Sequence, residues 1–140
     1  MNRYWFSLSI VLLLLTTSQA QPRKFRDLIG YWEIAGKQNE GAVLQISDSN
    51  NIFLIYMGET RKITNIRIDF SKSPLWFDFT ATDNSGSSMN VKSLVECTGE
   101  YVMKWQLFID EDRSPYFTST KGELLYLKKK NNIMPTAVNQ

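Results

Sequence analysis

The residue types that most often perform catalysis or hold metals are scarce in this chain. It has no histidine and one cysteine, Cys97, so histidine-dependent acyl transfer, imidazole ligation and a structural zinc site are excluded. The sequence also has no glycine-rich phosphate-binding loop. Its aspartates and glutamates fall mostly in predicted turns or on faces expected to point outward. We therefore expect a protein that is not an enzyme and that holds neither a metal ion nor another cofactor.

Aromatic side chains are instead the residues whose spacing indicates binding. In a strand, side chains at every second position share one face. Six aromatic residues occupy the face that we expect to point inward: Trp32, Phe70, Phe77, Phe79, Tyr101 and Trp105. They would either fill the interior or line a compact apolar pocket open at one end, where Tyr56, Ser93 and Tyr126 would orient a ligand. The candidate ligand-binding residues are Trp32, Tyr56, Phe77, Phe79, Ser93, Trp105 and Tyr126.

These side chains must be positioned by β-strands, because the chain beyond residue 28 alternates apolar and polar residues. Turn-forming residues interrupt this alternation at intervals of roughly eight to twelve residues. The pattern predicts eight strands, at about 29–36, 41–47, 52–57, 60–70, 74–80, 88–97, 100–109 and 122–129. An antiparallel meander of this kind can close on itself, which removes its exposed edges. The predicted fold is therefore all-β, a single antiparallel eight-stranded up-and-down barrel.

The N-terminal residues have the features of a signal peptide. Arg3 precedes an apolar stretch over 6–15, and Ser18-Gln19-Ala20 forms a small-x-small cleavage site. We therefore expect the mature protein to be exported, either to a periplasm or out of the cell, without a membrane anchor. The predicted regions are the signal peptide (1–20), a polar, basic lead-in (21–27), the barrel (28–130) and a flexible C-terminal tail (131–140).

The net charge limits the kinds of binding partner that we expect, and the cysteine content excludes an internal disulfide. The whole chain has a net charge of +2, and removal of Arg3 with the signal peptide lowers it to +1. A charge this close to zero gives no reason to expect a nucleic acid or an anionic membrane as a partner. One cysteine cannot form an intramolecular disulfide, and the alternation of Cys97 with Val91 and Val95 predicts a buried, unreactive thiol. We expect a monomer.

Three segments resemble lipocalin-type (calycin) barrels, in particular the short lipocalin-like domains of exported bacterial proteins. The first is the Gly-x-Trp motif Gly30-Tyr31-Trp32 on the first predicted strand. The second is a Ser-Lys-x-Pro turn over 71–74 that leads into the aromatic strand. The third, Arg113-Ser114-Pro115-Tyr116-Phe117, is similar to an Arg-Pro-x-x-Phe signature before the last strand.

The resemblance implies an exported protein that carries a small hydrophobic or amphipathic ligand inside the barrel. It also implies that Trp32 packs near the closed end of the barrel against a basic residue from late in the chain, here Lys128 or Lys129. Two features of other barrels of this type are missing from the sequence. There is no match to the Thr-Asp-Tyr stretch of larger lipocalins, and the last strand lacks the Arg-x-Tyr carboxylate clamp of intracellular fatty-acid binders.

A second interpretation stays open. An eight-stranded barrel is just wide enough for its own side chains or for one small ligand. If the aromatic residues fill it, the protein would be a protein-interaction or surface-structural module, with Trp76 on the outer surface as the contact residue. An interior cavity of about 300 Å³ or more would favour the ligand carrier. A dry core with an apolar outer patch would favour the module.

Overall fold

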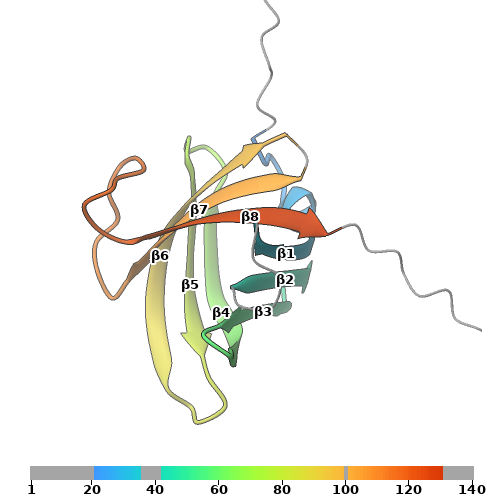
Figure 1. Cartoon of the computed structure of the whole chain (residues 1–140), viewed down its shortest axis with the longest axis vertical. Helices are drawn as coiled ribbons and strands as arrows, with labels where there is room; N and C mark the ends of the chain where they lie inside the picture. Colours follow the sequence, from blue (N-terminus) through green and yellow to red (C-terminus); the bar gives the residue numbers. More distant parts are fainter. Residues whose placement is uncertain (1–20, 36–41, 100, 131–140) are drawn as a thin grey trace, which may run out of the picture.

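Eight antiparallel strands follow one another around a closed barrel (Figure 1). The strands are β1 (Gly30–Ile34), β2 (Val43–Asp48), β3 (Asn51–Tyr56), β4 (Glu59–Asp69), β5 (Leu75–Thr82), β6 (Ser88–Thr98), β7 (Val102–Ile109) and β8 (Glu123–Lys130). The computed structural model describes residues 21–35, 42–99 and 101–130, so the predicted signal peptide and C-terminal tail lie outside the described residues. The predicted all-β up-and-down barrel is confirmed, and it is consistent with a lipocalin-like fold. Within the described ranges, no helix is long and apolar enough to span a membrane.

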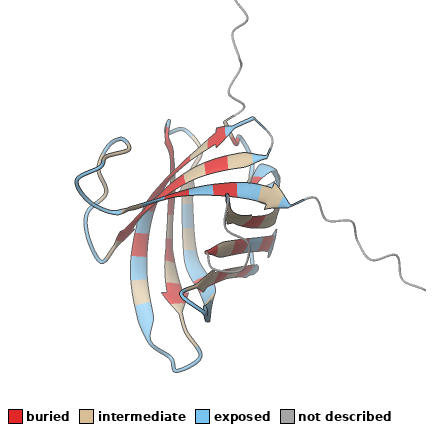
Figure 2. Cartoon of the chain, viewed as in Figure 1, coloured by how far each residue is buried: buried red, intermediate tan, exposed pale blue. Residues whose placement is uncertain are grey.

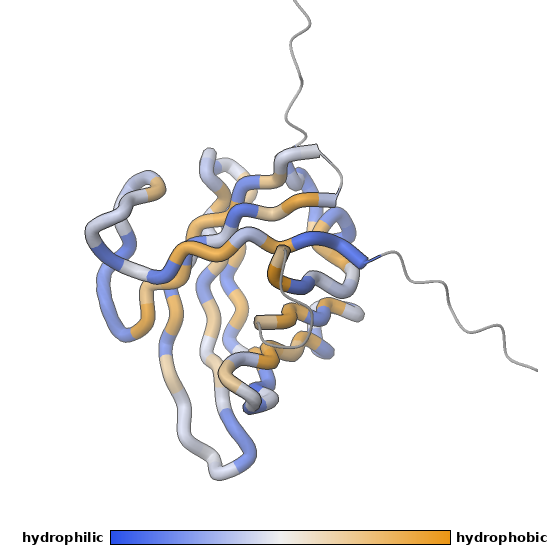
Figure 3. Tube along the Cα trace, viewed as in Figure 1, coloured by the Kyte–Doolittle hydropathy of each residue, from blue (hydrophilic) through white to orange (hydrophobic). Residues whose placement is uncertain are grey.

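Alternation of side chains along the strands separates the core from the surface. β5 is the clearest case, because Leu75, Phe77 and Phe79 are buried whereas Trp76 and Asp78 between them are only partly covered. Figures 2 and 3 show buried and exposed positions, and apolar and polar ones, alternating along the strands. Apart from Leu94 and Phe108, the buried apolar residues form one cluster inside the barrel. The two-residue period in the sequence is therefore the pattern that separates the inside of the barrel from the outside.

The single thiol lies inside this core. Cys97 on β6 is buried, and its pKa is raised to about 11, chiefly because burial disfavours the charged thiolate. The thiol is therefore protonated at neutral pH, whereas the thiolate is the reactive form. The prediction of a buried thiol is confirmed.

A short 3-10 helix, η1 (Phe25–Leu28), packs at one end of the barrel, which we call the closed end. Leu28 is fully buried, and its carbonyl accepts a 2.9 Å hydrogen bond from the Trp32 indole N–H. The Lys129 ammonium lies 5.4 Å from the centre of the Trp32 ring. The Lys129 stem passes close over Gly30, where a Cβ atom would lie 2.6 Å from Lys129 Cε. Lys129 is therefore the basic partner of Trp32, and the lead-in is part of the packed structure.

The connection between β7 and β8, residues 110–122, packs against the outer surface of the barrel, and we call it the outer strap. Gln106 projects outward from β7 and yet is only 1% exposed, because the strap covers it. Its amide nitrogen donates to the carbonyls of Thr118 (2.7 Å) and Lys121 (2.9 Å), and its oxygen accepts from the Thr118 N–H (3.0 Å). Phe108, two positions further along β7, is also fully buried. The strap thus has its own polar and apolar anchors on β7.

Substitution of two glycines that have nearly the same φ angle can test the contact between the outer strap and β7. Gly122 at the end of the strap has φ = 71°, and Gly99 in the β6–β7 turn has φ = 70°. A Cβ atom at position 122 would lie 2.8 Å from the Leu107 carbonyl oxygen and 2.9 Å from the Phe108 ring, whereas one at position 99 meets nothing within 4 Å. We expect Gly99→Ala to lower the free energy of unfolding by about 1–2 kcal/mol through backbone strain. Gly122→Ala should lower it by about 1–3 kcal/mol more, because it adds the clash.

Urea unfolding followed by tryptophan fluorescence measures both losses. Equal losses for the two variants would contradict the close approach of the strap to β7.

Candidate functional site

Three of the aromatic side chains predicted to line a pocket pack against one another in the middle of the barrel. The ring centres of Phe77, Phe79 and Trp105 lie 5.3, 5.9 and 6.4 Å apart. None of the three residues is more than 3% exposed. Surfaces this inaccessible leave no room for a water molecule beside the rings. The middle of the barrel is therefore filled by its own side chains, as is usual for close-packed interiors.

Ser93, which we predicted to orient a ligand, has its hydroxyl engaged inside the core. The hydroxyl donates to the Phe77 carbonyl and accepts a 2.8 Å hydrogen bond from the Trp105 indole N–H. The residue is fully buried. Trp32 is equally buried at the closed end, and its indole N–H is bonded to a backbone carbonyl. The structure thus gives both polar groups internal partners.

Two residues expected to face inward lie on the outside. Tyr126 is 50% exposed and Tyr101 is 47% exposed, so the predicted inward orientation of both is wrong. On β8 the buried positions are Leu125 and Leu127, which places Tyr126 on the outer face. The run of residues 124–127 has no apolar-polar alternation from which this could be read. Tyr101 lies in the turn before β7, outside the strand that would impose a face on it.

At the end of the barrel opposite η1, which we call the mouth, several inward-facing side chains are half-buried, as Ile66, Ile68 and Phe70 are towards the other end. Ile34, Tyr56, Met89 and Ile109 lie at the mouth and pack against the core cluster. The Tyr56 hydroxyl on β3 donates a hydrogen bond to the carboxylate of Glu123 on β8, 67 positions away. Burial first, and then this carboxylate, raises the pKa of Tyr56 to about 12, so the phenol is neutral at neutral pH. The mouth therefore combines apolar side chains with a fixed polar pair.

An arginine that we did not predict also points into the mouth. Arg61 on β4 lies opposite Leu54 in register, and opposite residues of an antiparallel pair share a face. Its guanidinium contacts Glu59 Oε2 at 2.8 Å and Asp83 Oδ2 at 3.5 Å. The side chain is 19% exposed, and its buried Nε–H has no hydrogen-bond acceptor among the described residues. A buried donor without an acceptor is costly and uncommon, so its presence here needs an explanation.

A β-bulge explains why Arg61 faces inward. The apolar residues from Ile66 onward predict that even-numbered positions of this strand face the core, which would leave Arg61 outside. The β4–β5 register shifts after Thr64, at Asn65, which has φ = 51°. One extra residue in a strand reverses the face of every position before it. Ile63 is accordingly buried, and the three-residue step from Ile63 to Ile66 is the sequence signal that could have revealed the bulge.

The carboxylate of Asp83 is held in place by its own loop. One of its oxygens accepts hydrogen bonds from the Ser85 hydroxyl (2.6 Å), the Ser85 N–H (2.9 Å) and the Ser87 N–H (3.0 Å). The Ser85 hydroxyl first, with the two N–H groups and Arg61, holds the pKa of Asp83 below its usual value. Asp83 therefore stays ionised at neutral pH. A hollow of about 360 Å³ at this end is lined by Gly58, Glu59, Thr60, Asp83, Asn84 and Ser85.

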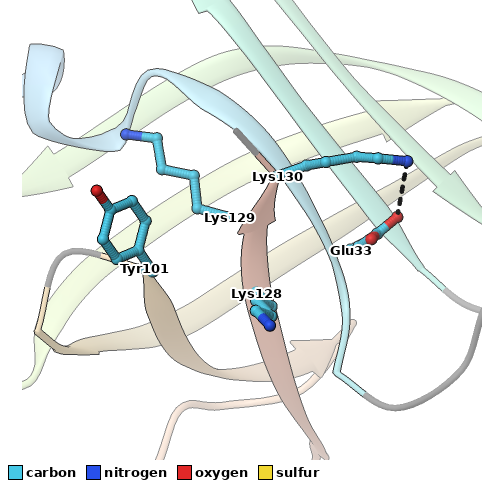
Figure 4. A pocket seen from close by; sticks show the side chains of 5 residues that line it. All are labelled: Glu33, Tyr101, Lys128, Lys129 and Lys130. Atoms are coloured by element: carbon cyan, nitrogen blue, oxygen red, sulfur yellow. Dashed lines mark ion pairs between the residues drawn. The ribbon is translucent and has the colours of Figure 1, made fainter. Parts of the chain in front are cut away.

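A second hollow lies on the outside of the barrel, beside the end of β8. It measures about 380 Å³ and is lined by Glu33, Tyr101, Lys128, Lys129 and Lys130 (Figure 4). Figure 4 shows the three lysine side chains pointing in different directions, and the Lys130 ammonium lies 3.8 Å from Glu33. Lysines that do not converge make a poor anion site. The described part of the chain also contains no group of three or more His, Cys, Asp or Glu residues that could hold a metal ion.

Comparison of the chain with models of protein families, with curated proteins and with solved structures gave no match. The class of fold therefore rests on the barrel itself, with its eight antiparallel strands in sequence order and its β1–β8 closure. These features define an up-and-down barrel with a filled middle, a closed end and a polar mouth.

The role of Ser93 in the core can be tested by Ser93→Ala. The change leaves the Trp105 indole N–H buried without an acceptor, so we expect the free energy of unfolding to fall by about 1–3 kcal/mol. The control is Ser88→Ala on the same strand, whose exposed hydroxyl bonds to Thr82 at 2.8 Å and should cost less than about 0.5 kcal/mol. Urea unfolding compares the two variants, and a Ser93→Ala loss no larger than that of Ser88→Ala would contradict the core role.

The raised pKa of Tyr56 predicts a specific loss of stability in alkali. The folded protein holds the phenol proton more tightly than the unfolded chain, whose ordinary pKa is 10.0. This contribution to stability is complete below pH 10 and is lost as the pH rises towards about 12. We expect the wild type to lose stability relative to Tyr56→Phe over that interval, measured as urea midpoints at fixed pH. Parallel pH profiles for the two proteins would contradict the Tyr56–Glu123 contact.

Proposed function

We propose that this chain is an exported, lipocalin-like protein without catalytic activity that binds one small amphipathic molecule at the mouth of the barrel. The observation that carries the proposal is the buried Nε–H of Arg61, which has no acceptor among the described residues. Half-buried apolar side chains face inward at the same end. An unused donor beside apolar surface suits a ligand that brings a hydrogen-bond acceptor on an apolar body.

The filled middle of the barrel limits how deep such a ligand can go. Phe77, Phe79 and Trp105 would form the floor of the site rather than its walls, because they already contact one another. Of the polar residues predicted to orient a ligand, Tyr56 is the one at the mouth. A short ligand held near the rim fits this arrangement better than a long chain threaded along the barrel axis.

A protein-interaction role centred on Trp76 has less support. The Trp76 side chain lies on the outer face of β5, as predicted, but two cations cover its ring. The Arg113 guanidinium lies 3.8 Å and the Lys72 ammonium 4.7 Å from the ring centre. Arg113 also forms an ion pair with Asp78. These contacts give Trp76 a role in attaching the outer strap to β5, which leaves little open aromatic surface for a partner.

Titration of the mature chain with N-phenyl-1-naphthylamine, an uncharged apolar fluorophore, tests the proposal. We expect saturable binding at one site with enhanced emission, because the mouth offers the fluorophore an apolar surface. Met89→Trp fills the mouth and should weaken binding by about tenfold, which is about 1.4 kcal/mol of lost contact. Lys92→Trp puts the same bulk on the exposed face of the same strand and should leave binding unchanged.

Two results would contradict the site: no saturable enhancement with the wild type, or equal binding by the two tryptophan variants. If binding is found, native mass spectrometry of protein taken from the exported fraction of its own host gives the mass of the natural ligand.

A further inference from the structure

We propose that the polar group of the ligand is an uncharged hydrogen-bond acceptor, such as an ester, ketone or hydroxyl oxygen, which accepts the Arg61 Nε–H at the mouth. This inference rests on the proposed ligand-binding function and adds the chemical class of the ligand. Arginine ordinarily binds carboxylates and phosphates through two parallel hydrogen bonds. The surroundings of Arg61 disfavour that mode here.

Protein carboxylates already occupy the outer edge of the Arg61 guanidinium. Nη2 contacts Glu59 Oε2 at 2.8 Å, and Nη1 contacts Asp83 Oδ2 at 3.5 Å. Asp83 is held in this position by three hydrogen bonds from its own loop. A ligand carboxylate would need Nε and one Nη together for a two-bond contact. Nε is the guanidinium nitrogen that contacts no acceptor among the described residues, and its single N–H can satisfy one acceptor atom.

The charges that face inward at the mouth also oppose an anion. Among the described residues they are one positive group, Arg61, and the carboxylates of Glu59, Asp83 and Glu123, which leaves a net charge of −2. A negatively charged head group entering this partly desolvated site would be repelled, whereas a neutral oxygen would not.

The other polar group at the mouth does not compete for the same ligand atom. The single hydroxyl proton of Tyr56 is donated to Glu123, so Tyr56 has no further proton to offer. The apolar part of the ligand would contact Ile34, Met89 and Ile109, which are half-buried and pack against the core. One donor beside three aliphatic side chains matches a neutral amphiphile with one oxygen group.

Displacement of N-phenyl-1-naphthylamine by three ligands of equal chain length tests the inference: methyl decanoate, decanoate and decylammonium at pH 7.5. We expect methyl decanoate to bind at least about tenfold more tightly than either charged ligand. Because an ester is also more apolar than an ion, variants of the protein must separate the hydrogen bond from simple hydrophobicity.

Arg61→Lys keeps the positive charge and removes the Nε–H. This variant should bind methyl decanoate about tenfold more weakly, which is the loss expected for one hydrogen bond from a charged donor. Its affinity for decanoate should be unchanged. Glu59→Gln alters an exposed partner, removes its negative charge while keeping an acceptor oxygen, and brings the charge of the mouth from −2 to −1. This variant should bind decanoate several-fold more tightly, and its affinity for methyl decanoate should be unchanged. Circular dichroism confirms that each variant is folded.

The outcomes distinguish this inference from the proposed function. If the fluorophore does not bind to the wild type, both fail. If it binds but decanoate or decylammonium displaces it as well as methyl decanoate does, the ligand class is wrong and the binding site stands. An Arg61→Lys variant that is folded and binds methyl decanoate as the wild type does would overturn the role of the Nε–H. Should that variant not fold, an unchanged decanoate affinity in Glu59→Gln would overturn the charge argument.

Discussion

The pairing of β8 with β1 closes the sheet, and this closure determines how much room the interior has. Eight strands enclose a space that their own side chains can fill. Phe77, Phe79 and Trp105 take up the middle of that space, with Ser93 satisfying the indole of Trp105. Because η1 packs at one end, the other end is the one that no element of the described chain covers. The position of the proposed site is thus a consequence of barrel size and of which end the N-terminal helix covers.

The polar character of the mouth arises from two local features of the chain. The bulge at Asn65 reverses the face of the β4 positions before it, so Arg61 points inward. The apolar positions after the bulge still face the core. The Tyr56–Glu123 hydrogen bond then links β3 to β8, two strands that are not neighbours in the sheet. Both features add charge and hydrogen-bonding groups to a rim that would otherwise be apolar. The proposed discrimination between head groups depends on these polar groups, since an aliphatic rim has none.

Several basic residues that suggest a binding surface are used within the fold instead. Lys129 lies over Trp32 at the closed end, and Arg113 lies over Trp76 on the outer surface. Lys104 lies 4.3 Å from the ring centre of Phe117 in the outer strap. In each case an aromatic ring is covered by a cation whose stem is apolar and whose charge lies over the face of the ring. These three cations therefore stabilise the fold by covering aromatic rings.

The barrel and its core follow from the amino-acid pattern alone, because a two-residue period assigns each residue of a strand to one face and turn residues mark where strands end. The resemblance to lipocalin-type barrels implied Lys128 or Lys129 as the basic partner of Trp32, and the β1–β8 register places Lys129 opposite Trp32. Only the tertiary structure placed Arg61 inside and Tyr126 outside and brought Tyr56 to Glu123. The two-residue alternation does not show which face a residue takes beyond a bulge or within an unbroken apolar run. It also does not show which residues of distant strands lie close together. Those relations are decided by register and closure of the whole sheet.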